Sequence, residues 1–355
     1  MKGLILSGGH GTRLRPLTYS QQKQLIPVAN KPILFYALED LVECGIKELG
    51  VIVTLNKNQV METVGDGSRW GVNTTFIEQE KPLGLAHAVK ISRDFLGDDS
   101  FVMYLGDNIL KGGIARYVEQ FRKSDADASI LLTHVENPEQ FGVAQLNKDG
   151  SVRKLIEKPK NPPSDLALVG IYMFTSKIFD AVKNIKPSGR NELEITDAIQ
   201  YLIDHNLRVD SAVVDGWWKD TGKPEDIIEA NHLVLDELTS YNKGTLEADA
   251  TIRGKVAIGK DTIIHKGSVV KGPVVIGRNC EIGPNTYIGP YTSIGDNCRI
   301  VDGDIEYSVI MDNTLIKSKK KIVDSLIGSS VRIFERNKLP KGHKFVIGDN
   351  SEVEI

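Results

Sequence analysis

The sequence predicts two domains of different fold class: an α/β domain with a mostly parallel sheet over residues 1–240, and a left-handed β-helix over residues 245–355. In the first part, short apolar runs alternate with segments of helical period, the pattern of a layered α/β domain. In the second part, an apolar residue recurs every six positions. The chain of 355 residues is also too long for one ordinary domain and fits two.

The α/β prediction rests on individual segments of the first part. Strands are expected at the apolar runs 4–6, 49–54, 101–105 and 130–135. Helices are expected at 33–41, 85–92 and 224–238, where apolar residues recur on one helical face. Pro32 stands where a first helical turn tolerates proline. Alternation of this kind predicts strands joined by helical crossovers.

The β-helix prediction rests on a hexapeptide repeat. Its apolar positions are Ile252, Ile258, Ile264, Val270, Ile276, Ile282, Ile288, Ile294 and Ile300. Such a repeat is typical of a solenoid in which three short strands form each coil and the isoleucines fill the inside. The register breaks at Glu306 and resumes at Ile310, so an irregular turn that interrupts the solenoid is expected there. Because the faces of solenoids commonly join subunits, we expect a homo-oligomer formed through residues 245–355, with a trimer as the first expectation.

Composition excludes several classes of partner. Hydrophobic residues at 41% and charged residues at 26% are the proportions of a globular protein. Lys and Arg number 44 against 47 Asp and Glu, so the net charge of -3 provides no basic field for nucleic acid. No segment approaches the roughly 20 apolar residues of a membrane helix, and the N-terminus is unlike a signal peptide. We therefore expect a cytoplasmic protein with neither a nucleic acid nor a membrane as partner.

A glycine-rich turn follows the first expected strand, at Gly8-Gly9-His10-Gly11-Thr12-Arg13-Leu14. Its backbone amides could bind phosphate, and the cations of Arg13, Arg15 and Lys23 suit a triphosphate. The turn is not a dinucleotide fingerprint, because Leu14 stands where the third glycine should be, and it lacks the Gly-Lys-Ser/Thr end of a Walker loop. By itself it fits a solvated strand-to-helix turn equally well.

Two aspartates are candidate metal ligands. Asp107 follows the expected strand 101–105 at a Gly-Asp turn, a place where α/β sheets present ligand groups. Asp220 is followed by Thr221 and Gly222. An aspartate beside glycine also caps turns, so this pattern alone leaves both interpretations open.

Longer stretches of the first domain resemble the sugar-phosphate nucleotidyltransferase family. The matching segments are GGHGTRL (8–14), KQLIPVANKP (23–32), QEKPLGLA (79–86), LGDN (105–108), FGV (141–143), IEKP (156–159), NELEITD (191–197) and WKDTG (218–222). They follow that family's order and imply its Rossmann-like nucleotidyltransferase fold. Within the family, KQL and ELEITD favour the branch that uses dTTP and glucose 1-phosphate and carries a C-terminal hexapeptide domain. The sequence departs from the short enzymes of the family at Phe141, where they have Tyr, and at Trp217-Trp218.

The resemblance implies roles for individual residues. Implied nucleotide-binding residues are Leu6, Gly8, Gly9, Gly11, Thr12, Arg13, Gln79, Gly84 and Asp107. Implied sugar-phosphate-binding residues are Gly142, Glu157, Lys158, Val169 and Arg190. Implied catalytic residues are Arg13, Lys23, Asp107 and Lys158, and Asp107 and Asp220 are the implied ligands of Mg²⁺. Gln79 can read a pyrimidine edge through its amide, and Gly84 would let the base approach the backbone.

The implied reaction is in-line attack by a phosphate oxygen of glucose 1-phosphate on the α-phosphorus of dTTP, with pyrophosphate leaving. The attacking group is already an anion, so catalysis needs positioning and charge neutralisation more than proton transfer. Three alternatives stay open: UTP or another hexose 1-phosphate as substrate, a non-catalytic regulatory subunit, and an acyltransferase activity of the β-helix. His265 and His343 are the candidate bases for the last of these, whereas His10 is interpreted as a solvated loop residue.

Overall fold

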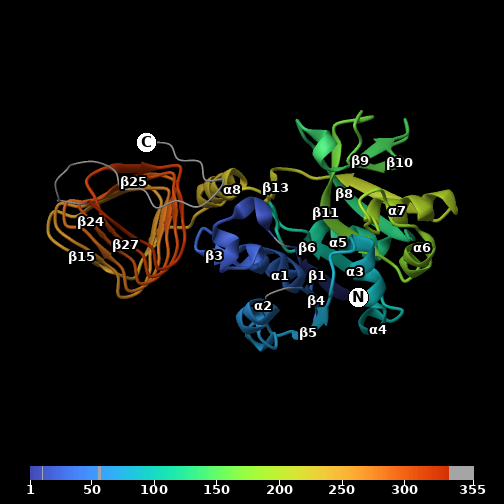
Figure 1. Cartoon of the computed structure of the whole chain (residues 1–355), viewed down its shortest axis with the longest axis horizontal. Coiled ribbons are helices and arrows are strands. Elements are labelled where there is room, and N and C mark those ends of the chain that lie inside the picture. The colour runs from blue at the N-terminus through green and yellow to red at the C-terminus, as the bar shows by residue number, and fades with distance from the viewer. Residues whose placement is uncertain (10, 55–56, 336–355) are drawn as a thin grey trace. The chain divides into compact units, whose positions relative to one another are not determined.

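The computed structural model describes residues 1–9, 11–54 and 57–335 (Figure 1). The chain divides into two compact units, Met1–Val234 and Leu235–Ile355. Within the described residues, no helix has the length and apolar character needed to cross a membrane.

A sheet that has nine strands in the described part of the chain forms the centre of the first unit. Its parallel part has the order β6 (Phe101–Leu105), β1 (Lys2–Ser7), β4 (Glu48–Val53) and β5 (Asn73–Glu78). The sheet continues beyond β6 through antiparallel β11 (Leu166–Phe174), which pairs with both β9 (Gly142–Leu146) and β8 (Ala128–His134). Strand β9 pairs in turn with β10 (Val152–Glu157), and β8 with β12 (Val209–Val213). The predicted Rossmann-like domain is confirmed, and antiparallel strands extend its parallel part.

Helices cover both faces of this sheet (Figure 1). One core contains apolar residues of α1 (Ile33–Glu43), α2 (Lys57–Val64) and α5 (Ala115–Lys123), and the other contains those of α3 (Leu85–Ile91), α4 (Arg93–Leu96), α6 (Ile178–Asn184) and α7 (Ile195–Asp204). Strand β1 supplies Ile5 to the first core and Leu4 and Leu6 to the second, because successive side chains of a strand point to opposite faces. This burial on both faces explains why the strands appear in the sequence as continuous apolar runs.

Three further elements complete the first part of the chain. The hairpin of β2 (Pro27–Val28) and β3 (Lys31–Pro32) precedes α1. A separate two-stranded sheet pairs β7 (Asn108–Leu110) with β13 (Trp218–Asp220). Helix α8 (Pro224–Asp236) follows β13.

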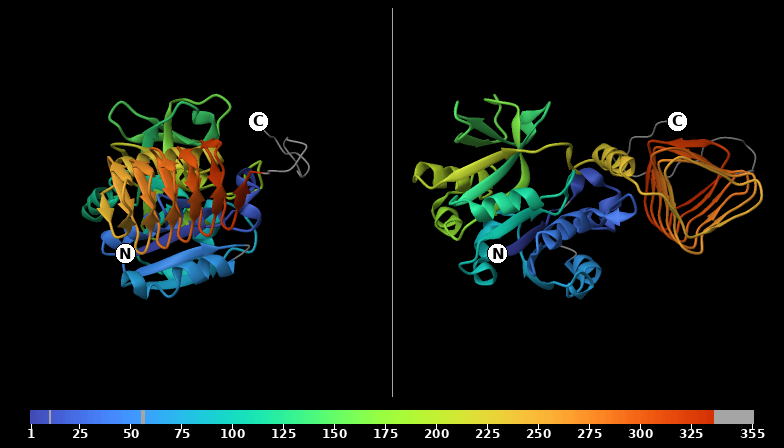
Figure 2. Two further views of the ribbon diagram at one scale, coloured as in Figure 1. Left: turned by 90° about the vertical axis from the view of Figure 1, so that its left-hand side faces the viewer. Right: turned by 180° about the vertical axis from the view of Figure 1, so that it is seen from behind.

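The second unit is a β-helix made of three parallel sheets (Figure 2). The first sheet contains β14 (Tyr241–Asn242), β17 (Val256–Ile258), β20 (Val274–Ile276), β23 (Thr292–Ile294), β26 (Val309–Ile310) and β29 (Leu326–Ile327). The second contains β15 (Thr245–Leu246), β18 (Ile263–Ile264), β21 (Glu281–Ile282), β24 (Arg299–Val301), β27 (Leu315–Lys317) and β30 (Arg332–Phe334). The third contains β16 (Thr251–Arg253), β19 (Val269–Lys271), β22 (Tyr287–Ile288), β25 (Asp304–Glu306) and β28 (Lys321–Val323).

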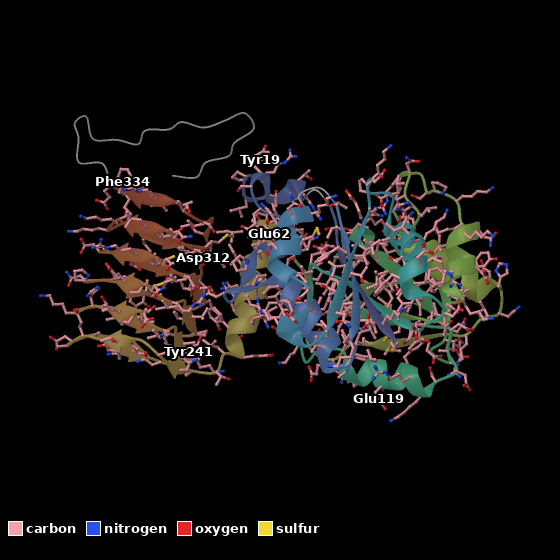
Figure 3. All side chains as sticks on the ribbon, turned by 90° about the horizontal axis from the view of Figure 1, so that it is seen from below. Tyr19, Glu62, Glu119, Tyr241, Asp312 and Phe334 are labelled. Carbon is pink, nitrogen blue, oxygen red and sulfur yellow. The ribbon has the colours of Figure 1, made fainter. Side chains whose placement is uncertain are left out.

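The stacking of these coils confirms the predicted left-handed β-helix. Repeat residues such as Ile258, Ile276 and Ile294 lie in register and are fully buried inside the coils. Figure 3 shows the stack from the side, with Tyr241 on the first coil and Phe334 on the last described one. The isoleucine ladder therefore forms the core of the unit.

The predicted interruption near Glu306 is wrong. Ile305, rather than residue 306, pairs with Ile288 in the coil before and with Ile322 in the coil after, and it is fully buried. The chain shortens its turns here, so that an interior apolar residue arrives one position early and the ladder continues. A change of spacing in the sequence is thus absorbed by the turns.

Candidate functional site

The first group of predicted site residues lies at one edge of the parallel sheet. Strands β1 and β6 are parallel neighbours with Leu6 opposite Leu105. The loop that starts at Gly8 and the turn at Asp107 therefore leave the sheet side by side. Gln79 directly follows β5 at the same edge. Ligands of α/β sheets bind at this carboxyl edge.

Lys23, Asp107 and Asp220 form the charged centre of this region. Lys23 lies in a short 3-10 helix, Lys23–Leu25, and its side chain is 10% exposed. Its Nζ lies 2.7 Å from Asp107 Oδ2 and 3.8 Å from Asp220 Oδ1. Three residues that are far apart in the sequence thus share one ion-pair cluster.

The short sheet of β7 and β13 brings Asp220 to Asp107. In this antiparallel pair, Asp220 lies opposite Asn108. The next residue, Thr221, donates from its backbone N (3.0 Å) and from its Oγ1 (2.8 Å) to the carbonyl oxygen of Asp107. These backbone contacts hold the two aspartate positions together independently of the charges on their side chains.

The charges in this cluster are unequally balanced. Burial raises the pKa of the Asp107 carboxyl, but the ion pair and hydrogen bond from Lys23 outweigh it, so that this pKa lies below its ordinary value. Burial, and then the charge of Asp107, raise the pKa of Asp220 from its ordinary 3.8 to about 6. Burial lowers the pKa of Lys23, but the two carboxylates outweigh it and the pKa is raised. One ammonium therefore balances Asp107 well and Asp220 only in part.

The glycine-rich loop is held close to this cluster. Gly9 and Gly11 have φ angles of 108° and 55°, and a Cβ on Gly11 would lie 2.9 Å from Thr18 Cγ2, so this turn requires glycine. Gln24 Nε2 donates to the carbonyl oxygen of Gly8 at 2.8 Å.

The residues after Gly11 form a short 3-10 helix, Thr12–Leu14, that buries Leu14 and exposes Thr12 and Arg13. The guanidinium of Arg13 lies against Gly222, next to Asp220, because a Cβ on that glycine would be 3.0 Å from Arg13 Nη2.

A pocket of about 210 Å³ lies on one side of the cluster. Its lining includes Leu6, Gly8, Gly9, Gln79, Gly84 and Asp107. These are six of the predicted nucleotide-binding residues, whereas Gly11, Thr12 and Arg13 are not part of the lining. The structure therefore brings together a large part of that predicted set.

Gln79 and Gly84 contact each other in this pocket. Gln79 Nε2 donates to the carbonyl oxygen of Gly84 at 3.2 Å and lies 3.0 Å from His87 Nδ1. Gly84 has a φ of 99°, and a Cβ there would lie 2.3 Å from the carbonyl oxygen of Leu193. The close passage of the Leu193 backbone therefore requires glycine at this position whether or not a base is bound.

A second pocket of about 570 Å³ lies on the other side of the cluster. Arg13, Phe141, Lys158, Trp218, Lys219 and Asp220 are among the residues that line it. Lys158 is exposed and has a φ of 43°, and its backbone N donates to the carbonyl oxygen of Phe141. Asp220 lines this pocket and Asp107 lines the smaller one, so the Lys23 ammonium contacts one carboxylate from each lining.

The remaining predicted sugar-phosphate residues form a neighbouring polar group. Arg190 Nη2 lies 3.1 Å from Glu157 Oε1 and 2.8 Å from Glu194 Oε2. Thr196 Oγ1 donates to Glu157 Oε2 at 3.3 Å, and a Cβ on Gly142 would lie 3.1 Å from that same oxygen. Burial, and then the charge of Glu194, raise the pKa of Glu157. Arg190 is thus engaged by carboxylates in this structure.

Val169 is fully buried in the core, so only its backbone could contact a ligand. Gly142, Glu157, Val169 and Arg190 belong to the lining of neither pocket. The structure thus keeps Glu157, Gly142 and Arg190 together, and although they line neither pocket, the chain neighbours Phe141 and Lys158 line the larger one.

The sequence analysis missed three residues that hold the cluster: Asn108, Thr221 and the indole of Trp218. Asn108 is 1% exposed and donates to Asp107 Oδ1 at 2.8 Å. In the sequence, an amide that directly follows a Gly-Asp turn after an apolar strand is a signal that could have identified Asn108. Trp218 offered a weaker signal, since it precedes Asp220 by two positions and therefore shares its strand face.

The other histidines and the metal donors can be placed only in part. His265 Nδ1 lies 3.0 Å from Glu247 Oε1 on the β-helix, and His10 and His343 lie outside the described residues. Among residues 1–9, 11–54 and 57–335, no group of three or more His, Cys, Asp or Glu side chains is arranged to hold a metal ion. Any metal site at the cluster would therefore rely on two carboxylates.

Comparisons with known proteins cover both units. The Nucleotidyl transferase family matches residues 2–237, and the GMPPB C-terminal domain matches residues 270–355. The low-salt glycan biosynthesis nucleotidyltransferase Agl11 of Haloferax volcanii is 50% identical over 100% of both chains. A glucose-1-phosphate thymidylyltransferase of Streptomyces antibioticus is 49% identical over 100% of this chain and 99% of its own.

A solved structure shares the fold of the first part. It is described as a glucose-1-phosphate thymidylyltransferase of Bacillus anthracis in complex with sucrose. It is 38% identical, has a TM-score of 0.63, and covers 68% of this chain and 98% of its own. The chain therefore belongs to the nucleotidyl transferase family and is an enzyme that transfers a nucleotidyl group to a sugar 1-phosphate.

Proposed function

We propose that this enzyme joins dTTP to α-D-glucose 1-phosphate, giving dTDP-glucose and pyrophosphate. The observation that carries the proposal is the Lys23 ammonium, which contacts two carboxylates, one from the lining of each of two pockets. The full-length likeness to a Streptomyces glucose-1-phosphate thymidylyltransferase supports these substrates. The Haloferax relative is equally similar, but its name specifies neither the nucleotide nor the sugar, and another relative is named a UTP–glucose-1-phosphate uridylyltransferase, so UTP is the competing substrate.

The nucleotide is assigned to the smaller pocket and the loop beside it. The base would lie between Leu6, Gln79 and Gly84, and the triphosphate would follow the loop of Gly8 and Gly9 toward Gly11, Thr12 and Arg13. Backbone amides of a glycine-rich turn and a guanidinium are suitable partners for phosphate oxygens. Gln79 is buried in the lining of this pocket, and its amide would contact the base edge.

Glucose 1-phosphate is assigned to the side of the larger pocket. The exposed Lys158 ammonium would bind its phosphate. The Glu157 carboxylate would accept hydrogen bonds from sugar hydroxyls, and the backbone at Gly142 and Val169 would donate to them or accept from them. Arg190 would hold Glu157 and approach the phosphate. A few polar groups placed in this way can fix the orientation of a neutral sugar.

Magnesium is assigned to Asp107 and Asp220. The residues fit the ion, because two partly buried carboxylates share a single ammonium and burial together with Asp107 raises the pKa of Asp220 to about 6, which indicates incomplete neutralisation. Mg²⁺ usually takes one or two carboxylates and fills its other positions with water and substrate phosphates. When bound, it would neutralise charge on the nucleotide phosphates.

The proposed reaction is a direct displacement at phosphorus. An oxygen of the sugar phosphate forms a bond to the α-phosphorus of dTTP while the bond from that phosphorus to the bridging oxygen breaks and pyrophosphate leaves with the electron pair. Arg13 and Lys23 would neutralise the phosphates that these two anions bring together, and Lys158 would hold the attacking group. No side chain needs to remove a proton.

The test is a substrate panel with the purified full-length protein. Pyrophosphate release should be fastest with dTTP and glucose 1-phosphate, and UTP should support a lower kcat/KM. Faster release with UTP would replace the thymidylyl assignment by the uridylyl one, and a preference for CTP, ATP or GTP would overturn both. Omission of the sugar phosphate is the control for nucleotide hydrolysis.

A further inference from the structure

A chain of hydrogen bonds links a tryptophan to the charged cluster. Trp218 Nε1 donates to Asn108 Oδ1 at 2.7 Å, and Asn108 Nδ2 donates to Asp107 Oδ1 at 2.8 Å. The other carboxylate oxygen, Asp107 Oδ2, accepts from Lys23 Nζ at 2.7 Å. Each Asp107 oxygen therefore has its own partner, and the partner of Oδ1 is held in turn by the indole.

The chemistry of the two end groups fixes the amide between them. An indole N–H can only donate, and an ionised carboxylate can only accept. Asn108 satisfies both groups in one orientation alone, since a flipped amide would set donor against donor and acceptor against acceptor. Asn108 is 1% exposed, so water offers little replacement for a lost partner.

The surroundings leave this chain of bonds little freedom. Trp218 packs edge-on against Phe141, with ring centroids 5.4 Å apart at an interplanar angle of 68°. A Cβ on Gly170 would lie 3.0 Å from Asn108 Oδ1, so the amide is also confined on its other side. Trp218 and Asp220 share one face of strand β13, and Asn108 pairs opposite Asp220. The strand that supplies Asp220 therefore also supplies the group that orients Asp107.

We propose that Trp218 is a positioning residue, which acts through the Asn108 amide to hold the Asp107 carboxylate with Oδ2 turned toward the cations of the site. The proposal rests on the function proposed above and deepens it. The tryptophan ring would contribute its N–H to the orientation of a carboxylate that it does not touch. A group that hydrogen-bonds a metal ligand directly, as Asn108 does, commonly changes metal affinity or activity by about 10- to 100-fold, and Trp218 acts through that group.

The test compares two identical substitutions. Trp218→Phe keeps the aromatic ring against Phe141 but removes the N–H. Trp70→Phe is the matched control, because Trp70 also packs edge-on against a phenylalanine, Phe35, at 5.0 Å and 73°, away from the cluster. We expect Trp218→Phe to raise the Mg²⁺ concentration for half-maximal pyrophosphate release about 10- to 100-fold, with the effect on KM for dTTP much smaller. Trp70→Phe should leave both values unchanged.

Two measurements separate positioning from a general loss of structure. Asn108→Ala should reproduce the shift in Mg²⁺ requirement. The double variant should raise this requirement no more than either single variant does, because both substitutions remove the same chain of bonds. In the metal-free protein with ¹⁵N-labelled tryptophan, Asn108→Ala should move the indole proton signal of Trp218 upfield and leave that of Trp70 in place. The second measurement needs neither substrate nor metal.

An unmoved indole signal in Asn108→Ala would overturn the proposal. So would an unchanged Mg²⁺ requirement in a folded Trp218→Phe, or full additivity of the two substitutions. A wild-type protein that released no pyrophosphate from dTTP and glucose 1-phosphate would instead contradict the proposed function, and the spectrum would still test the hydrogen-bond chain.

Discussion

Replacement of Asp220 by Asn should stabilise the protein and inactivate it at the same time. Burial, and then the charge of Asp107, raise the pKa of Asp220 from 3.8 to about 6, so the folded protein binds this proton more tightly than the unfolded chain does. By linkage, the free energy of unfolding then falls as the pH rises from about 4 to about 6. Above that range the ionised carboxylate destabilises the fold by the full amount. Asn has nearly the same size and no charge, so it removes this destabilisation.

The size of this effect follows from the shift and from the exposure of the side chain. One pKa unit corresponds to about 1.4 kcal/mol, but a side chain that is 33% exposed is partly screened by solvent. We therefore expect a gain of about 1–2 kcal/mol in the free energy of unfolding at pH 7.5, or roughly 2–8 °C in the Tm of a unit of this size. Turnover should fall by roughly a hundredfold or more, the scale for the loss of a key electrostatic group.

Thermal unfolding in the presence of EDTA tests this prediction, since no metal then offsets the charge of Asp220. The stabilisation by Asp220→Asn should be present at pH 7.5 and largely lost at pH 4, where the wild-type carboxyl is protonated in the folded protein and about half protonated in the unfolded chain. Asp98→Asn is the control, because Asp98 is 87% exposed and pairs with Arg93 at the surface. Equal stabilisation at both pH values, or none at pH 7.5, would refute the electrostatic reasoning.

The remaining predictions concern the substrates and the assembly. Lys158→Met should raise KM for glucose 1-phosphate about tenfold or more while KM for dTTP changes little, because a charge-assisted phosphate contact is lost; an equal rise with the neighbouring Lys160→Met would contradict a specific contact. Gln79→Leu should lower kcat/KM for dTTP by roughly tenfold and reduce the ratio of kcat/KM for dTTP to that for CTP, since a leucine cannot hydrogen-bond a base edge. An unchanged ratio would show that Gln79 does not recognise the base. Light scattering at micromolar concentration should find a homo-oligomer, with a trimer as the first expectation, and a variant truncated before residue 245 should be smaller in subunit number; a monomeric full-length protein would contradict the prediction.

The fold could be predicted where the sequence carries a strong period. The isoleucines at six-residue spacing predict the β-helix because each one must fill the same interior position in successive strands. A strict six-residue period gave the wrong prediction near Glu306, because the turns of a coil can lose a residue without moving the ladder, and the ladder continues through Ile305 at a spacing of five.

Part of the candidate site could be predicted for a similar reason. Gly8 and Gln79 directly follow strands of the parallel sheet, Asp107 lies two residues beyond the end of another, and parallel strands bring their carboxyl ends to one edge. The contribution of Trp218 could not be predicted, since it depends on the pairing of two three-residue strands, and its partner Asn108 lies 110 positions away. Such short strands have no periodicity of their own.

The carboxylates that contact Arg190 could not be predicted from the sequence either. The turn from Ser188 to Glu194 brings two carboxylates onto one guanidinium, since Arg190 contacts both Glu192 and Glu194, and Glu157 from another strand adds a third. Sequence spacing shows the charges but not which of them meet. The role assigned to this arginine by resemblance stays a prediction.

Asp107 is proposed to serve in the transfer of a nucleotidyl group from dTTP to glucose 1-phosphate. Phosphorus NMR of the reaction with Mg²⁺ tests it most directly, because it reports both products. The wild-type protein should form dTDP-glucose and pyrophosphate in equal amounts, and Asp107→Asn, still folded, should form both at least about a hundredfold more slowly. Equal rates for the two proteins would make Asp107 a structural turn residue, and pyrophosphate without a nucleotide sugar would contradict the transfer itself.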